Sequence, residues 1–174
     1  MLQVTIRQER AGDEDAVRAV NDDAFGRPLE GAIVDGVRGT DRWIDGGSLV
    51  AETPEGRIVG HLLISEGDLL SDERPARRIW LIGPVAVRPN SQRKGVGGVL
   101  IRAAIEYATR RGQPVLCLVG HDTYYPRFGF TSARTIGIEP PQQAWGDRNW
   151  LALRLAAWEP SCKGQVRYPP PFPD

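Results

Sequence analysis

The segment GPVAVRPNSQRKGVGGVLIRAAIEYATRRG, residues 83–112, decides the fold, because it joins the end of a strand, a glycine-rich loop and an amphipathic helix. The strand begins upstream in IWLIGPVAV, 79–87, and its nearly continuous apolar character is typical of a central strand buried on both faces. Pro84 cannot donate a ladder hydrogen bond, so we expect a bulge or an interruption there. The helix is predicted from apolar side chains at helical spacing, which are Val96, Leu100, Ala103, Ala104, Tyr107 and Ala108.

The flanking segments extend this unit in both directions. PVLCLVG, 114–120, reads as a second buried strand, which predicts a strand–helix–strand unit with parallel strands. Upstream, the turn signal TPEG joins SLVAE, 48–52, to RIVGHLLIS, 57–65, as a hairpin, and EGDLLSDERPAR, 66–77, reads as a polar loop.

The two ends of the chain have weaker patterns. VTIR, 4–7, reads as a strand, followed by helices over 12–25 and 29–38 whose apolar stripes are Val17, Val20 and Ala24, and then Leu29, Ile33 and Val37. TYYPRFGF suggests a short helical turn that ends at Gly129, and strands are expected in TIGIE, 135–139, and WLALRL, 150–155. The proline-rich end, 167–174, is expected to be extended. The fold class predicted is therefore α/β with a mixed sheet.

Composition narrows the classes of protein. The 174 residues suit one domain, 1–174, with 160–174 as a proline-rich tail. Lys plus Arg and Asp plus Glu are both 22, so we expect no nucleic-acid partner. No apolar run approaches the roughly 20 residues that span a bilayer, and the N-terminal residues lack a signal-peptide core. Two cysteines form no disulfide framework, so a reducing cytoplasm is expected, and no residue cluster has metal-ligand spacing.

The glycine-rich loop has the components of an anion site. The amides at a helix N-terminus lack partners, glycines allow close approach, and adjacent cations add charge. The residues that supply these parts are Gln92, Arg93, Lys94, Gly95, Val96, Gly97 and Gly98. The loop matches neither the phosphate-loop NTPase pattern nor the dinucleotide fingerprint. By itself it is equally consistent with an ordinary connection between a strand and a helix.

The segment 83–112 together with YYPRFGF, 124–130, resembles the GNAT superfamily of N-acetyltransferases. The first matches a bulged strand, a Gln/Arg-x-x-Gly-x-Gly loop and a helix, and the second matches a tyrosine followed by Gly-Phe. The resemblance covers residues 4–155 and is closest to a bacterial subgroup of predicted acetyltransferases that carry YYxRFGF. It implies a twisted mixed sheet of about seven strands, with an antiparallel N-terminal part and a parallel strand–helix–strand core.

The resemblance also implies roles for individual residues. Backbone groups of Val85, Ala86 and Val87, freed beside Pro84, would pair with the pantetheine arm of acetyl-CoA, and the loop 92–98 would hold its pyrophosphate. Tyr125 would line the cofactor site and act as general acid toward the departing thiolate, since tyrosine, with an ordinary pKa of about 10, stays protonated at neutral pH. The other interpretations are that Val85 and Val87 are core residues and that Tyr125 is an aromatic packing residue.

The general base stays open. Family members often place a glutamate on the bulged strand, but 79–87 has no acidic residue. The candidates are Glu66, Asp68, His61 and His121, or a relayed water. Cys117 lies in an apolar strand and is expected to be inert, whereas Cys162 is expected in a polar tail without a partner.

The function implied is transfer of an acetyl group from acetyl-CoA to a primary amine within a ternary complex. The alternatives are a noncatalytic acyl-CoA sensor and a nucleotide-binding domain. The acceptor, a small molecule or a protein amine, cannot be read from the sequence. We expect it to contact the first two helices, the loop 66–77 and the region from Trp145 to Trp150. A homodimer stays open.

Overall fold

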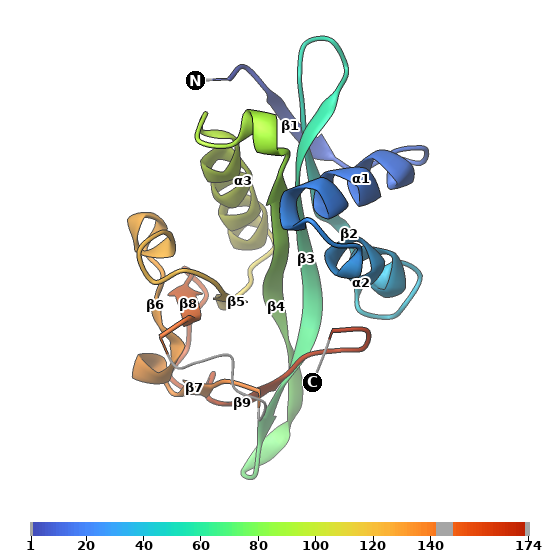
Figure 1. Cartoon of the computed structure of the whole chain (residues 1–174). Helices are drawn as coiled ribbons and strands as arrows, with labels where there is room; N and C mark the ends of the chain where they lie inside the picture. The colour runs from blue at the N-terminus through green and yellow to red at the C-terminus, as the bar shows by residue number, and fades with distance from the viewer. Residues whose placement is uncertain (1, 142–147, 173–174) are drawn as a thin grey trace. The chain divides into compact units, whose positions relative to one another are not determined.

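The computed structural model describes residues 2–141 and 148–172. The chain forms two compact units, Met1–Ile64 with Gly83–Ala104, and Ser65–Ile82 with Ile105–Asp174. We describe each unit by itself. Two long strands, β3 (Ile58–Ser71) and β4 (Arg74–Val87), and the helix α3 (Val96–Arg110) contribute residues to both units. Figure 1 labels these elements.

The first unit has the strand order β1-β2-β3-β4. Strand β1 (Thr5–Gln8) runs antiparallel to β2 (Trp43–Glu52), with Thr5 opposite Glu52 and Gln8 opposite Leu49. Helices α1 (Glu14–Phe25) and α2 (Leu29–Val37) pack against each other. The short 3-10 helix η1 (Pro89–Ser91) lies between β4 and α3.

Neighbouring residues of β3 show which helices cover which face of this strand. A Cβ atom built on Gly60 would lie 2.9 Å from Val96 Cγ1 and 3.0 Å from Leu100 Cδ1, so the start of α3 packs directly over this glycine. The next side chain, His61, contacts Asn21 of α1. Because successive side chains of a strand point to opposite faces, α3 and α1 lie on opposite sides of β3.

The helix predictions agree with the structure except in the stripe of α2. Val17 and Val20 of α1 and Ile33 and Val37 of α2 are buried, but Leu29 is 40% exposed. The buried side of α2 is formed by Glu30, Gly31, Ile33, Val34 and Val37. The expected stripe was therefore wrong at Leu29, because the buried face is centred nearer to 30 and 34 and the first residue of the helix lies at its edge.

The second unit has the strand order β3-β4-β5-β8-β6. Its added strands are β5 (Val115–Val119), β6 (Thr131–Ser132) and β8 (Trp150–Arg154). Strands β4 and β5 are parallel, as the strand–helix–strand pattern predicts, and pair from Trp80 with Leu116 to Ile82 with Leu118. The 3-10 helices η2 (Tyr125–Phe128) and η3 (Ala133–Ile136) lie between β5 and β7. The expected turn before Gly129 is confirmed as η2.

The sequence predictions for three segments of this unit were wrong. The expected polar loop 66–77 is a hairpin, because β3 continues to Ser71 and β4 begins at Arg74. Its partner is β9 (Gly164–Arg167), in the segment expected to be a tail, with Leu69 opposite Val166. The expected strand 135–139 is reduced to β7 (Ile138–Glu139), which runs parallel to β9. The sheet therefore has nine strands in the described part of the chain, rather than about seven.

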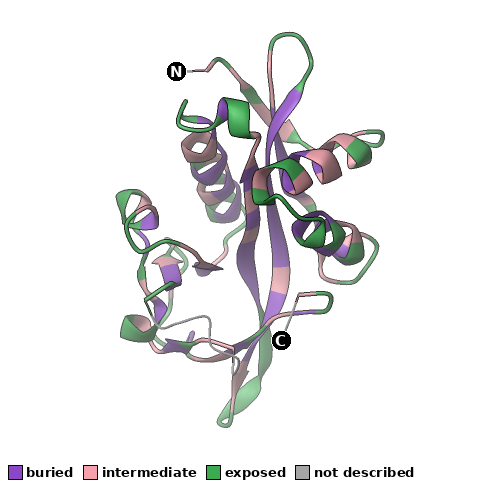
Figure 2. Ribbon diagram, viewed as in Figure 1, coloured by how far each residue is buried: buried purple, intermediate pink, exposed green. Residues whose placement is uncertain are grey.

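The core of the second unit lies around Trp150, whose side chain is fully buried and whose indole Nε1 donates to the Ile138 carbonyl at 3.0 Å. Both cysteines belong to this core. The placement of Cys162 in a polar tail was therefore wrong: the segment between β8 and β9 turns inward, and the Cys162 amide donates to the Glu159 carbonyl at 2.9 Å. Burial raises the pKa of the Cys117 and Cys162 thiols. The central parts of β3 and β4 are also buried, whereas the tip of their hairpin is exposed (Figure 2).

No helix among the described residues is both long enough and apolar enough to cross a bilayer.

Candidate functional site

The loop before α3 adopts backbone conformations that suit its glycines. Gly95 has a φ of 91°, in the left-handed region that costs other residues about 1–2 kcal/mol. Arg93 has a φ of 58° and, within the described ranges, is the one residue besides glycine with a positive φ. Gln92 Nε2 donates to the Val87 carbonyl at 3.0 Å, and Lys94 Nζ donates to the Asn90 carbonyl at 2.8 Å. These contacts fix the loop to the end of β4 and to η1.

The same loop presents the free amides of the α3 N-terminus. The Val99 amide donates to the Gly95 carbonyl at 3.2 Å, so the amides that precede Val99 have no partner carbonyl within the helix. The loop is exposed from Gln92 to Gly95, and Gly97 and Gly98 are half-buried. The Val96 side chain is buried, so only its backbone is available to a ligand.

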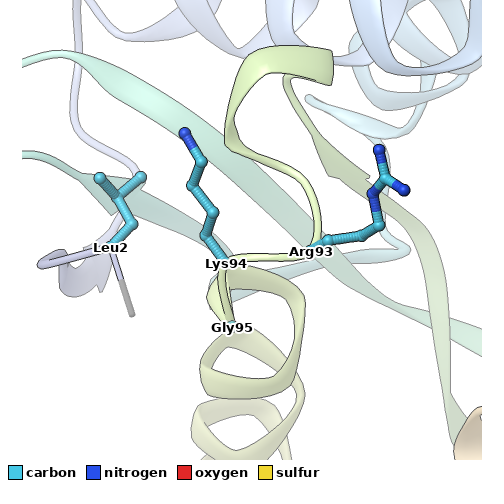
Figure 3. A pocket seen from close by; sticks show the side chains of 4 residues that line it. All are labelled: Leu2, Arg93, Lys94 and Gly95. Atoms are coloured by element: carbon cyan, nitrogen blue, oxygen red, sulfur yellow. The ribbon is translucent and has the colours of Figure 1, made fainter.

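A hollow of about 530 Å³ lies beside this loop and is lined by Leu2, Arg93, Lys94 and Gly95 (Figure 3). The Leu2 amide donates to the Lys94 carbonyl at 3.0 Å, which holds the N-terminal segment against the loop. No carboxylate of the described residues forms an ion pair with Arg93 or Lys94. Two cations without a carboxylate partner in the described part of the chain and a helix N-terminus thus lie at this hollow, and both favour negative charge.

Strand β4 runs without a break through Pro84 to Val87, and what stops before this proline is its pairing with β5. The Gly83–Pro84 peptide bond is cis, and the parallel ladder with β5 covers only Trp80–Ile82 on β4. Beyond Pro84, burial alternates: Ala86 is buried, and Val85 and Val87 are half-buried. The Val87 carbonyl already accepts a hydrogen bond from Gln92. The predicted residues Val85–Val87 and 92–98 are thus joined in the first unit.

Tyr125 lies in the second unit, where it begins η2. Its side chain is buried and makes edge contacts with the rings of Tyr124, at 5.2 Å between centroids, and Phe130, at 5.9 Å. Burial, and to a smaller extent Tyr124, raise the pKa of Tyr125 to about 12. Among the described residues no hydrogen bond engages its hydroxyl group. The hydroxyl is therefore a protonated donor without a partner in this part of the chain.

Gly120 makes the position of the Tyr125 ring possible, and the sequence analysis missed it. A Cβ atom at Gly120 would lie 2.1 Å from Cε2 and 2.6 Å from Cδ2 of Tyr125, far closer than two carbon atoms can approach. The Gly120 amide donates to the Asn149 carbonyl at 2.9 Å, which fixes the backbone there. The sequence feature that could have indicated this role is a glycine directly after a buried strand.

The four candidate bases have different surroundings. His61 is fully buried, with both ring nitrogens in hydrogen bonds. Asp68 accepts from Arg167 at 2.8 Å, and Glu66 accepts from Arg78 at 3.2 Å. His121 is exposed, and its carbonyl accepts from the Tyr125 amide at 3.3 Å.

The expected acceptor region is only partly visible. Trp145 lies outside the described residues, and Trp150 is a core residue rather than an exposed contact. Within the described ranges, no three His, Cys, Asp or Glu side chains gather as a metal site would require.

Known proteins resemble this chain in sequence. Residues 18–130 match the model of the acetyltransferase (GNAT) family. The chain is 32% identical over 158 residues to the uncharacterized N-acetyltransferase YjhQ of Escherichia coli (strain K12), covering 89% of this chain and 86% of that protein.

Solved structures show the same fold. The GNAT family acetyltransferase of Brucella melitensis, in complex with acetyl-CoA, has a TM-score of 0.77 and 30% identity and covers 99% of this chain and 100% of its own. The N-acetyltransferase YhbS of Escherichia coli, in complex with CoA, has a TM-score of 0.85 and 22% identity, with coverage of 97% and 91%.

Proposed function

Because the chain belongs to the acetyltransferase (GNAT) family, we propose that it transfers an acetyl group from acetyl-CoA to a primary amine by direct attack in a ternary complex. The observation that carries this proposal is the exposed loop 92–95 at the N-terminus of α3, with its two cations and the hollow beside it. Pyrophosphate is an anion of the kind that such a helix terminus binds. The solved relatives with CoA and acetyl-CoA support coenzyme A as its carrier.

The donor would extend from this loop along the end of β4. In our proposal the amides of Gly95, Val96, Gly97 and Gly98 hold the pyrophosphate, and Gln92, Arg93 and Lys94 surround it. Backbone groups of Val85, Ala86 and Val87 pair with the pantetheine arm. The end of the parallel ladder at Ile82 and the half-buried state of Val85 and Val87 support this path.

Tyr125 is the proposed general acid. The amine nitrogen attacks the thioester carbonyl carbon, the carbon–sulfur bond breaks, and the departing sulfur takes the proton of the Tyr125 hydroxyl. A pKa of about 12 keeps this hydroxyl protonated at neutral pH. The same pKa makes full transfer to a free thiolate unfavourable, so proton donation accompanies bond cleavage. The tyrosinate regains a proton from the acetylated nitrogen, which completes the balance.

β4 has no acidic residue to serve as base in this scheme, and the candidate carboxylates of β3, Glu66 and Asp68, accept from arginines. We therefore propose that the acceptor amine enters in its neutral form or loses its proton to water. Rates should then rise with pH until the free amine is mostly neutral.

Ligand binding and thiol release test the function separately. Coenzyme A at 100 times its dissociation constant should stabilise the protein by about 2.7 kcal/mol, which raises the melting temperature by about 5–10 °C. ATP and NAD at the same concentration should leave the melting temperature unchanged. Acetyl-CoA with a panel of amines should then release thiol. Stabilisation by coenzyme A with no release across the panel would instead favour an acyl-CoA sensor.

The contact between Gly120 and Tyr125 leads to a second test. Gly120→Ala should displace the Tyr125 ring and lower turnover by about 10²-fold, the cost of misplacing a reacting group by about 1 Å. The thiol-release assay should be run on Gly120→Ala alone and in the Tyr125→Phe background. If Gly120 acts through the Tyr125 hydroxyl, Gly120→Ala should lower turnover much less in the Tyr125→Phe background than in the unaltered protein. An equal loss in both backgrounds would contradict the assignment.

A further inference from the structure

A continuous chain of polar side chains is buried in the first unit, between α1, β2 and β3. Asn21 and His61 are fully buried, and Ser48 is 1% exposed. Asn21 Nδ2 lies 3.0 Å from His61 Nδ1, and Ser48 Oγ lies 2.9 Å from His61 Nε2. The catalytic scheme above uses none of these residues.

The partners of Asn21 determine which ring nitrogen of His61 carries the proton. Asn21 Nδ2 donates one hydrogen to the Val17 carbonyl at 2.8 Å, and its second hydrogen points to His61 Nδ1. Nδ1 must therefore be an acceptor, and the ring proton lies on Nε2. Nε2 then donates to Ser48 Oγ.

The chain continues from Ser48 to the end of α2. The Ser48 hydroxyl donates to Glu9, whose other carboxylate oxygen accepts from Arg38 at 2.6 Å. Arg38 caps α2 and lies over the ring of Trp43, 5.4 Å from its centroid. Hydrogen bonds thus run without a break from α1 through β3 and β2 to the C-terminal end of α2.

This arrangement is not a second nucleophilic site. In a catalytic serine–histidine pair the histidine accepts the serine proton. Here His61 donates to Ser48, and Ser48 gives its own proton to Glu9. The role of these hydrogen bonds is therefore structural, and it requires a neutral imidazole ring at His61.

We propose that His61 is a positioning residue, which fastens α1 to the sheet while its ring is neutral and releases α1 when the ring is protonated. A proton on Nδ1 would face the amide hydrogens of Asn21, so two donors would oppose each other. Rotating the amide would present Asn21 Oδ1 to His61 but would place an oxygen against the Val17 carbonyl. Among the described residues, Oδ1 has no hydrogen-bond partner in the present arrangement.

The charged neighbours of His61 also favour the neutral form of its ring. Burial, and after it the positive charge of Arg38, lower the pKa of His61 to about 3. Glu9 is the opposing negative charge, and it is already engaged by Arg38 and Ser48. An unfolded histidine takes up its proton at about pH 6.5. Between that pH and about pH 3 the unfolded chain binds one more proton than the folded chain, so stability falls as pH falls.

The first experiment uses the unaltered protein and the nitrogen resonances of its imidazole rings. The chain has two histidines, and His121→Gln assigns their signals. We expect His61 to show the neutral form with the proton on Nε2, without change from pH 7.5 to pH 5. A ring that titrates near pH 6.5, or that carries its proton on Nδ1, would overturn the proposal.

The second experiment removes the titration and keeps the hydrogen bonds. In His61→Gln the side-chain amide can accept from Asn21 and donate to Ser48 but cannot be protonated. The folding equilibrium constant of the unaltered protein, measured by denaturant unfolding, should fall about tenfold per pH unit between pH 6 and 5 relative to the variant. The protection factors of the α1 amides, which correct for the slower intrinsic exchange at lower pH, should fall over the same range in the unaltered protein alone. An equal loss of stability with falling pH in the unaltered protein and in His61→Gln would overturn the proposal.

Asn21→Asp provides a second variant should His61→Gln fail to fold. A carboxylate at this position can only accept, so the same resonances should report a proton on Nδ1 of His61 at pH 7, in a neutral or a charged ring. A ring that keeps its only proton on Nε2 in this variant would contradict the proposed control by residue 21. All of these readouts are independent of acetyl transfer.

Discussion

Tyr125→Phe is expected to lower turnover by about 10²–10⁴-fold and to leave the affinity for acetyl-CoA unchanged. The substitution removes only the hydroxyl, so the ring keeps its contacts with Tyr124 and Phe130. Without the hydroxyl, the departing sulfur must take its proton from water. Thiol release with saturating amine gives the turnover, and calorimetric titration gives the affinity.

Tyr124→Phe is the matched control for this substitution. Tyr124 is the adjacent residue, is half-buried, and has the Arg127 guanidinium 4.6 Å from its ring centroid. Removing its hydroxyl should leave turnover within a few fold of the unaltered protein. Unchanged turnover in Tyr125→Phe, or equal losses in both variants, would remove Tyr125 from the mechanism.

Replacing Gly95 and Gly97 together by valine is expected to weaken coenzyme A binding at least about 100-fold, or about 2.7 kcal/mol. The left-handed φ of 91° at Gly95 disfavours a β-branched residue. Both new side chains would also cover the amides at the start of α3, which the pyrophosphate must approach. Calorimetric titration with coenzyme A measures the effect.

The matched control is Gly112→Val, at the other end of α3. Gly112 has a φ of 66°, so valine imposes a similar backbone cost there without altering the loop. This variant should lose stability and still bind coenzyme A. Retained binding by the Gly95 and Gly97 variant would show that the loop is only a connection between a strand and a helix.

Much of the fold could be predicted because its signals are local. The helical spacing from Val96 to Ala108, the apolar strands on either side and the turn before Gly129 are each contained in one short stretch. The parallel pairing of β4 and β5 follows from that order, since a helix between two strands returns the chain in the same direction. The loop residues and Tyr125 could be nominated for the same reason, by matching short motifs.

The predictions that failed depend on partners that lie far away in the sequence. The segment 66–77 looked like a polar loop, and the strand that pairs with its β3 part, β9, is about 100 residues away and was itself expected to be a tail. Cys162 was placed in a polar tail because its neighbours are polar, and only the fold brings it into the same core as Cys117.

By itself the sequence determined the strand–loop–helix–strand unit and the chemical character of its loop, because backbone propensity, glycine placement and apolar period are properties of short segments. Only the tertiary structure decided where single side chains meet. The ring of Tyr125 lies over Gly120, and His61 lies between Asn21 and Ser48. The protonation state of each buried group follows from such contacts, because burial and hydrogen-bond partners, rather than residue type, determine its pKa.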